Sequence, residues 1–276
     1  MKTILYAIVS IMPRKFFGLI LKRIFELKSP KILVSIMKKL FVSFYKIDMS
    51  DAEADIEKYD SVQKLFCRKL KKNCRPAGPG LVSPVDGFIS EAGLINNNTL
   101  IQAKNIEYKL DQLLPAEYVG LFAGGWFCSI YLAPYNYHRI HSPVDGEIES
   151  FYYQPGDFWP VNGLTLNKVK GLFNVNERVS TLIKTMNSNV CVVKVAAMGV
   201  GDVRLSYLND NEKKYKRGLT KFEFPKTINK LDELGIFAFG STVILISDFK
   251  ADSEVLFLLK SKIIKTGETL LSQFKN

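Results

Sequence analysis

The sequence has little that would serve secretion, disulfide cross-linking or membrane spanning. Its 276 residues include only four cysteines, none in a Cys-x-x-Cys pair, which is too few for a disulfide framework and suits a reducing compartment. The apolar run at residues 4–12 is shorter than the roughly 20 residues that span a bilayer. Pro13, Arg14 and Lys15 follow it in place of a small-residue cleavage site. We therefore expect a cytosolic protein that can contact a membrane surface.

Common catalytic signatures are also missing. The chain has no glycine-rich phosphate loop, no Gly-x-Ser-x-Gly elbow and no His-Glu-x-x-His helix. Its only two histidines, His138 and His141, lie three residues apart, and histidine is the side chain best suited to proton transfer near neutral pH. On a strand this spacing would place the two rings on opposite faces. A metal site would need a third and a fourth ligand, for which the sequence offers no pattern, so we expect none.

Net charge is concentrated at the N-terminus. Residues 1–47 contain ten basic residues and one acidic residue, so they carry +9 of the net charge of +11. The remainder is nearly neutral, which favours a tethering surface over a body that is basic throughout. Nucleic-acid binding is an alternative supported by this charge alone.

The basic segment has the pattern of two amphipathic helices. Phe17, Ile20, Leu21, Ile24 and Leu27 recur at helical spacing, and the pattern restarts after the prolyl residue at position 30. The second helix has an apolar stripe and a polar stripe on opposite faces. The apolar stripe comprises Ile32, Leu33, Ile36, Met37, Leu40, Phe41 and Phe44. The polar stripe comprises Lys31, Ser35, Lys38, Lys39, Ser43 and Lys46. Such helices suit the headgroup layer of an anionic membrane, although packing on the rest of the protein is the alternative.

The rest of the chain divides at residue 75. Residues 51–75 are predicted to be helical, which completes a helical membrane-associating region over residues 1–75. From residue 76 to 276, short β-favouring runs alternate with turn residues, which predicts a β-rich catalytic domain and an α+β fold overall. The expected strands cover residues 87–90, 118–122, 127–132, 147–153, 190–196, 242–247 and 255–259.

Two further local features carry meaning only in combination. The pentapeptide Ser-Pro-Val-Asp-Gly occurs at residues 83–87 and again at 142–146, and a Pro-Asp-Gly turn entering a strand is sufficient to explain both copies. Near the C-terminus, Gly240 precedes Ser241, and a hydroxyl after glycine can attack the preceding carbonyl group because no side chain obstructs it. Neither feature by itself identifies an activity.

Taken in order, these segments resemble the bacterial phosphatidylserine decarboxylase proenzyme family along nearly the whole chain. The resemblance rests on residues 41–49, 65–70, 75–76, 84–87, 137–143, 155–157, 161–162, 176–179 and 235–243, the last of which contains Phe239-Gly240-Ser241-Thr242. Two departures concern local detail. Asn136 stands where relatives often have aspartate, and residues 195–202 match the family's glycine-rich segment only loosely.

The resemblance implies a role for each candidate residue. Asp86, His141 and Ser241 would form the self-processing triad, which selects Asp86 over Asp145 of the second pentapeptide. His138 matches a histidine associated with the substrate and the decarboxylation step. Cleavage between Gly240 and Ser241 would yield a β chain, 1–240, and an α chain, 241–276, that begins with a pyruvoyl group derived from Ser241.

The resemblance also implies the reaction and its partners. The pyruvoyl group, the only cofactor expected, would form a Schiff base with the amine of phosphatidylserine and release phosphatidylethanolamine. The expected partners are this lipid, an anionic membrane surface, the second chain of the cleaved β/α heterodimer and a further copy of it in a homodimer, but no nucleic acid. The expected location is peripheral, on the cytoplasmic side of the cytoplasmic membrane. A non-catalytic membrane-binding relative that retains the fold is the alternative.

Overall fold

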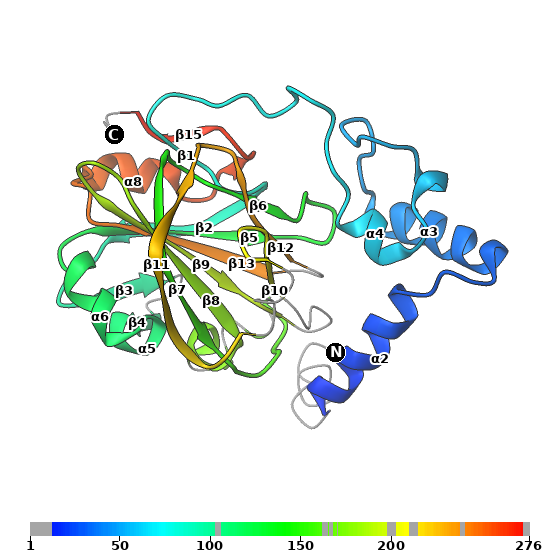
Figure 1. Ribbon diagram of the computed structural model, residues 1–276, viewed down its shortest axis with the longest axis horizontal. Helices are drawn as coiled ribbons and strands as arrows, with labels where there is room; N and C mark the ends of the chain where they lie inside the picture. The colour runs from blue at the N-terminus through cyan, green and yellow to red at the C-terminus, as the bar shows by residue number, and fades with distance from the viewer. Residues whose placement is uncertain are drawn as a thin grey trace.

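A computed structural model describes residues 13–102, 106–161, 165, 168–169, 171–197, 203–209, 215–237 and 241–272. The order of helices and strands confirms the α+β class, with helices first and a β-rich region after them (Figure 1). The elements are α2 (Arg14–Phe25), α3 (Lys31–Tyr45), η1 (Ile56–Lys58), α4 (Val62–Phe66), β1 (Leu81–Val82), β2 (Gly87–Leu94), β3 (Thr99–Gln102), β4 (Ile106–Lys109), α5 (Leu110–Leu113), α6 (Ala116–Val119), η3 (Gly120–Phe122), β5 (Trp126–Leu132), β6 (Arg139–His141), β7 (Gly146–Gln154), α7 (Leu172–Val175), β8 (Arg178–Lys184), β9 (Asn189–Val195), β10 (Val203–Leu205), β11 (Gly218–Ile228), β12 (Glu233–Phe237), β13 (Ser241–Ser247), α8 (Ser253–Leu259), β14 (Ile263–Ile264) and β15 (Thr269–Leu271).

The body is built on an antiparallel eight-stranded sheet in the order β11-β7-β8-β9-β13-β5-β2-β14. Strand β13 lies inside this sheet between β9 and β5, and every one of its residues is buried. Its central residues, 243–246, are a continuous apolar run, the pattern of a strand covered on both faces. A second sheet, β10-β12-β6, lies on the side of the body that faces α2, α3 and α4 (Figure 1).

Helices α2 and α3 confirm the two helices expected near the N-terminus. No residue of α2 is buried, and α3 buries only Val34, Lys38 and Phe41. Phe41 packs edge-on against Phe66 of α4, with ring centroids 6.2 Å apart. This contact attaches α3 to α4. The outward side of α3 exposes four large apolar residues at helical spacing: Ile32, Ile36, Leu40 and Phe44. Within the described ranges, no helix combines the length and apolar character that crossing a bilayer demands.

Three expected elements are wrong. Residues 118–122 form α6 and η3, because Pro115 starts a helical turn there. Residues 255–259 belong to α8, whose Asp252 side chain accepts a hydrogen bond from the Glu254 N–H at 2.9 Å and caps the helix. Both runs are short and apolar, so periodicity does not separate strand from helix.

The third error concerns residues 51–75, of which only η1 and α4 are helical. The backbone of this segment pairs across a loop, since the N–H groups of Glu53 and Lys71 donate to the carbonyl oxygens of Lys69 and Asp51, both at 2.9 Å. It also accepts from a distant side chain. Lys38, expected on the polar face of α3, is buried, and its Nζ donates to the carbonyl oxygens of Ile56 at 2.9 Å and Tyr59 at 2.6 Å. A local sequence pattern does not reveal such contacts.

Candidate active site

Ser241 is the first residue of β13. It pairs with Leu132 of β5, its side chain is fully buried, and its Oγ has no hydrogen-bond partner among the described residues. Buried hydroxyl groups are usually paired, so an unpaired one requires a specific explanation, such as strain, a chemical role, or a bound water or ion. Gly240, together with residues 238 and 239, lies outside the described residues.

His138 immediately precedes β6 and is fully buried. Its ring lies against Phe66, with centroids 3.9 Å apart. Its Nδ1 donates to the carbonyl oxygen of Asn136 at 2.8 Å, since that oxygen can only accept. The other nitrogen, Nε2, therefore carries the lone pair, and it has no partner within the described part of the chain. Burial lowers the pKa of His138 to about 3, so the ring is neutral at pH 7.

His141 ends β6 and lines an open cavity of about 270 Å³, so the two rings do face different environments. Its Nδ1 donates to the carbonyl oxygen of Leu231 at 2.6 Å, which leaves Nε2 to accept from the Tyr137 hydroxyl group at 2.9 Å. Burial lowers the pKa of His141 below its usual value of 6.5. The neutral form with a basic Nε2 is the form that a general base requires.

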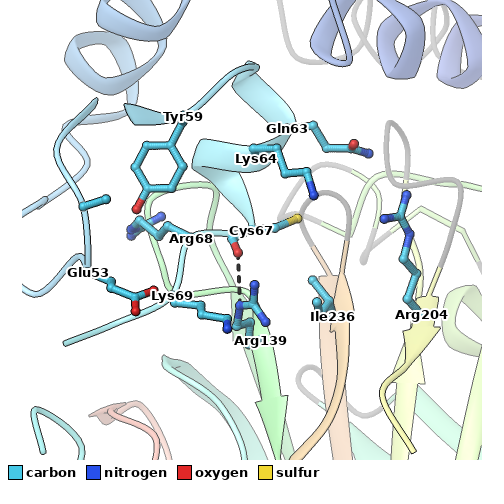
Figure 2. A pocket seen from close by; sticks show the side chains of 11 residues that line it. Glu53, Tyr59, Gln63, Lys64, Cys67, Arg68, Lys69, Arg139, Arg204 and Ile236 are labelled. Atoms are coloured by element: carbon cyan, nitrogen blue, oxygen red, sulfur yellow. Dashed lines mark hydrogen bonds between the residues drawn. The ribbon is translucent and has the colours of Figure 1, made fainter. Parts of the chain in front are cut away.

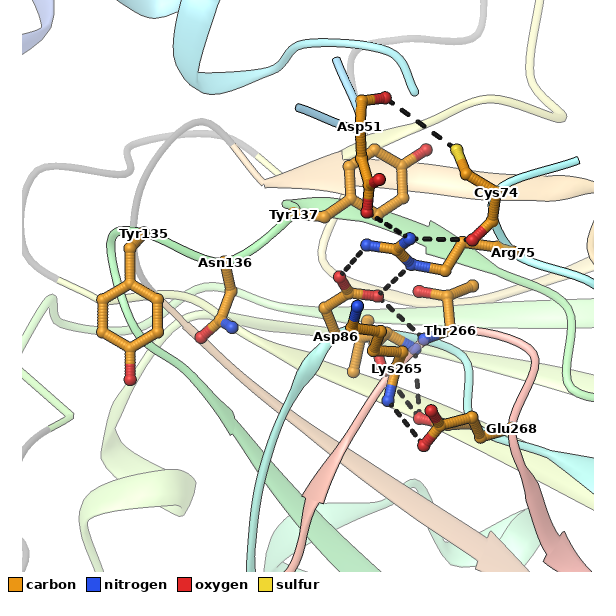
Figure 3. Close-up of polar contacts among 12 residues, drawn as sticks. Asp51, Cys74, Arg75, Asp86, Tyr135, Asn136, Tyr137, Lys265, Thr266 and Glu268 are labelled. Atoms are coloured by element: carbon orange, nitrogen blue, oxygen red, sulfur yellow. Dashed lines mark hydrogen bonds and ion pairs between the residues drawn. The ribbon is translucent and has the colours of Figure 1, made fainter. Parts of the chain in front are cut away.

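Asp86 is held by an arginine rather than by a histidine (Figure 3). Arg75 donates from Nε to Oδ1 at 3.1 Å and from a terminal nitrogen to Oδ2 at 2.7 Å. The N–H of Thr266 also donates to Oδ1, at 2.8 Å. Arg75 also pairs with Asp51 at 2.8 Å. Through its two ion pairs it connects residues 13–75, the N-terminal segment, to the turn at residues 84–87.

The described residues do not connect Asp86, His141 and Ser241 by hydrogen bonds. Asp86 and His141 are nevertheless neighbours: the N–H of His141 donates to the carbonyl oxygen of Pro84 at 2.9 Å, and the charge of Asp86 acts to raise the His141 pKa. His138 lies beside the strand that leads to the serine, because its carbonyl oxygen accepts from the N–H of Phe237 at 3.0 Å.

The two Ser-Pro-Val-Asp-Gly segments fold alike, and the residue before each donates a backbone hydrogen bond to the proline carbonyl oxygen of the other: Val82 to Pro143 at 3.1 Å and His141 to Pro84 at 2.9 Å. In each, the serine hydroxyl group donates to the carbonyl oxygen two residues later, at 2.7 Å in both copies. Asp145 accepts from the N–H of Lys230 at 2.7 Å, as Asp86 does from Thr266. The copies differ in burial, since Asp86 is buried and Asp145 is exposed. The second copy therefore serves as a structural turn.

Sequence reasoning missed three residues near these groups. Arg75 appeared only as part of a motif, and Tyr137 only as a neighbour of the histidines, although each contacts a candidate residue directly. Lys194 of β9 gave no signal. It pairs with Val243 of β13, so it lies on the same face of the sheet as Ser241, and it is fully buried.

The cysteines and the potential metal ligands of the described residues form no further candidate site. All four cysteines are free, and burial raises the pKa of the Cys67 thiol to about 11, which makes it a poor nucleophile. No group of three or more His, Cys, Asp or Glu side chains is arranged to hold a metal ion in the part of the chain that the structure describes.

Comparison with known proteins places this geometry in context. The sequence profile of a family described as phosphatidylserine decarboxylase matches residues 62–272. A phosphatidylserine decarboxylase proenzyme of Myxococcus xanthus is 33% identical over 268 residues, which cover 95% of this chain and 96% of that protein. The proenzyme of Brevibacillus brevis is 38% identical over 84% of this chain and 86% of its own length. That of an Anaeromyxobacter species is 38% identical, with 75% and 76% covered.

Proposed function

Since the chain belongs to the phosphatidylserine decarboxylase family and is an enzyme of that activity, we propose that it converts phosphatidylserine to phosphatidylethanolamine through a Schiff base to a pyruvoyl group made from its own Ser241. The observation that carries this proposal is the buried, unpartnered hydroxyl group of Ser241 at the start of β13. The relatives' description as proenzymes supports a processing step.

The proposed processing uses only the chain's own atoms and water. Ser241 Oγ attacks the carbonyl carbon of Gly240, the peptide C–N bond breaks, and an ester replaces it. Loss of the Ser241 α-proton then breaks the Cβ–O bond, which releases residues 1–240 with a free carboxylate. The remaining dehydroalanine tautomerises to an imine, and hydrolysis releases ammonia and leaves the pyruvoyl group at position 241.

His141 is proposed as the base for the first step, with Asp86 supporting it. In the uncleaved chain the His141 ring is neutral because burial lowers its pKa, and its Nε2 carries the lone pair. That lone pair accepts a hydrogen bond from the Tyr137 hydroxyl group. The Tyr137 contact must therefore break before Nε2 can take the proton of Ser241. Asp86, fixed by Arg75 close to the His141 backbone, supplies the negative charge that stabilises the imidazolium once it forms.

His138 is proposed to act on the substrate. The pyruvoyl group supplies a ketone carbonyl that condenses with the substrate amine and takes up the electron pair left when CO₂ departs. The His138 ring is shielded from water by Phe66, and its burial keeps it neutral. Its Nε2 can therefore accept a hydrogen bond from bound substrate. A dry apolar surrounding favours loss of a carboxylate, because the charged ground state is poorly solvated there.

The sheet explains how the cleaved chains would stay together. Strand β13 of the α chain is hydrogen-bonded on both edges to strands of the β chain, β9 and β5. Strand β15 likewise pairs with β1, and β14 with β2. Cleavage after residue 240 thus leaves a β/α heterodimer held by four strand pairings with the larger chain. A further homodimer stays a prediction from the resemblance.

Membrane association at the cytoplasmic face is proposed for α2 and α3. Their exposed apolar side chains, among them Phe16, Leu19, Ile32 and Phe44, occur on helices that also carry the chain's basic charge. An anionic substrate held in a bilayer would attract this surface.

Intact mass spectrometry of the purified protein tests the proposal. We expect two chains, 1–240 and 241–276, the smaller one blocked at its N-terminus, and a single uncut chain of 31.3 kDa for Ser241→Ala. Ser247→Ala, which alters another buried serine of β13, should cleave like the wild type. An uncut wild-type protein that decarboxylates the lipid would overturn the pyruvoyl mechanism. An uncut protein without activity would support the non-catalytic alternative.

A further inference from the structure

A basic cavity of about 300 Å³ lies between the N-terminal segment and the second sheet (Figure 2). Tyr59, Lys64 and Arg68 border it from the α4 side, and Arg139, Ile236 and Arg204 border it from β6, β12 and β10. Its volume is at the small end of the range for ligand sites, which suits a headgroup better than an acyl chain.

The charges around this cavity are unbalanced. Five cationic side chains line it, namely Lys64, Arg68, Lys69, Arg139 and Arg204, against the single carboxylate of Glu53. Arg139 is paired with Glu233 at 2.5 Å. Within the described residues, no ion pair neutralises the other four cations.

Arg68 is the strongest indication of a ligand. Arg68 is only 4% exposed. One terminal nitrogen of its guanidinium group donates to the carbonyl oxygen of Tyr135 at 3.1 Å. Its Nε and its other terminal nitrogen have no partner among the described residues. Leaving a buried guanidinium group unpaired is costly, and burial lowers its pKa. The half-buried arginine of the neighbouring site, Arg75, is by contrast matched with two carboxylates. An anion bound at Arg68 would supply the missing partner.

The cavity adjoins the proposed catalytic groups. Phe66, two residues before Arg68, lies against the His138 ring, and the Cys67 thiol donates to the carbonyl oxygen of Phe237 at 3.5 Å. Phe237 is four residues from Ser241, so their Cα atoms are at most about 14 Å apart along the chain. An anion at Arg68 therefore lies beside the groups that would act on the amine and carboxylate of the same headgroup.

We propose that this cavity binds the phosphodiester group of the phospholipid, an inference that rests on the proposed function. The headgroup offers two anions, and the chemistry separates them. An arginine paired with the carboxylate would stabilise the ground state that must lose CO₂, whereas the phosphodiester keeps its charge throughout the reaction. Guanidinium groups also match phosphate oxygens well. The carboxylate then lies on the apolar side, near Phe66 and His138.

Binding of short-chain lipids to the uncleaved Ser241→Ala protein tests this site. That protein cannot form the pyruvoyl group, so the outcome does not depend on the proposed chemistry. Dihexanoyl phosphatidylserine and dihexanoyl phosphatidylethanolamine both carry the phosphodiester, but only the first carries the carboxylate. In calorimetric titrations below micelle formation, we expect Lys64→Ala/Arg204→Ala to weaken binding of both lipids about tenfold or more.

Two controls make the result specific. Lys221→Ala/Lys262→Ala removes the same charge from exposed sites on β11 and beside β14, the two ends of the large sheet, and should leave both affinities within about twofold. Arg68→Gln should weaken both lipids at least as much as the first double variant, provided that circular dichroism shows it folded. If it does not fold, the double variant alone decides.

Three results would overturn the proposal. Weakened binding of phosphatidylserine with unchanged binding of phosphatidylethanolamine would place the carboxylate in the cavity. Unchanged binding of both lipids by the Lys64/Arg204 variant would show that the cavity does not hold the headgroup. Inorganic phosphate that binds as tightly as either lipid would indicate a site for free phosphate.

Discussion

Arg75 holds Asp86 through two parallel hydrogen bonds, 3.1 and 2.7 Å long, and both side chains are largely buried. The pair connects the last part of the N-terminal segment to the turn that enters β2. Asp86 is the carboxylate that the proposed processing depends on, so its position depends on a residue that has no direct part in the chemistry.

Replacing Arg75 by alanine should therefore disturb both folding and processing. Removing one partner of a buried ion pair typically costs about 3–5 kcal/mol, because the remaining charge is left uncompensated. We expect a loss of this size in the unfolding free energy of the Ser241→Ala background, in which the chain stays single, and slower cleavage in the otherwise native chain. Lys72→Ala, at an exposed cation of the same segment, should change neither measurement. Normal cleavage by Arg75→Ala would remove the assigned role of the pair.

Tyr137→Phe should shift the pH dependence of self-cleavage. The Tyr137 hydroxyl group donates to the lone pair of His141 Nε2 and so stabilises neutral imidazole. Without it, the pKa of His141 should rise from its lowered value, and a base that must be neutral should then lose activity at a higher pH. In pulse–chase measurements after cell-free translation, we expect the acidic midpoint of the cleavage rate to move upward.

The matched control for that change is Tyr135→Phe, because Tyr135 lies two residues away and is 53% exposed. Its profile should follow the wild type. An unshifted midpoint in Tyr137→Phe would argue that His141 is not the base, and loss of cleavage in His138→Ala but not His141→Ala would assign the step to the other histidine.

Lys194 should make stability depend on pH in a specific alkaline window. It is fully buried, its Nζ donates to Thr181 Oγ1 at 2.5 Å, and burial lowers its pKa from 10.5 to about 7. Between pH 7 and 10.5 the unfolded chain binds more protons than the folded chain, so the unfolding free energy rises with pH across this range. Below pH 7 both states are protonated and the full destabilisation is present.

Lys194→Met should remove that slope and raise the unfolding free energy at pH 7. Denaturant unfolding of the Ser241→Ala chain at pH 7 and pH 9.5 measures both effects. Lys184→Met, at an exposed lysine on the adjacent strand β8, should leave the slope unchanged. A slope that persists in Lys194→Met would assign it to other groups.

Phe44→Glu should weaken membrane binding without altering the body. Phe44 is 79% exposed at the end of the outward apolar stripe of α3, and a carboxylate there opposes both insertion and attraction to anionic lipid. We expect reduced co-sedimentation with vesicles that contain phosphatidylglycerol, a further reduction as salt is raised, and normal self-cleavage. Met186→Glu changes a residue that is even more exposed, on the β8–β9 turn, and should bind as the wild type does. Equal binding by both variants would count against this surface.

The elements that could be predicted from the sequence are those with a long or clear period. Helices α2 and α3 follow their apolar spacing, and β5, β7, β9 and β13 follow runs rich in β-branched and aromatic residues. The short runs at 118–122 and 255–259 were misassigned because four or five apolar residues fit either structure. In α3 the apolar stripe was right, but the burial of Lys38 depended on carbonyl groups some 20 residues away.

The sequence by itself determined the family, through an ordered set of motifs that ends at Ser241, and it selected Asp86, His138 and His141 as candidates. Only the tertiary structure decided what these groups contact. Asp86 bonds to Thr266, 180 positions away, and His141 to Leu231, 90 positions away. Such partners are set by which strands and turns meet in the folded sheets, and that depends on burial of the whole core rather than on local sequence. For the same reason the sequence does not reveal that Arg68, close to His138, has two nitrogens without a partner among the described residues.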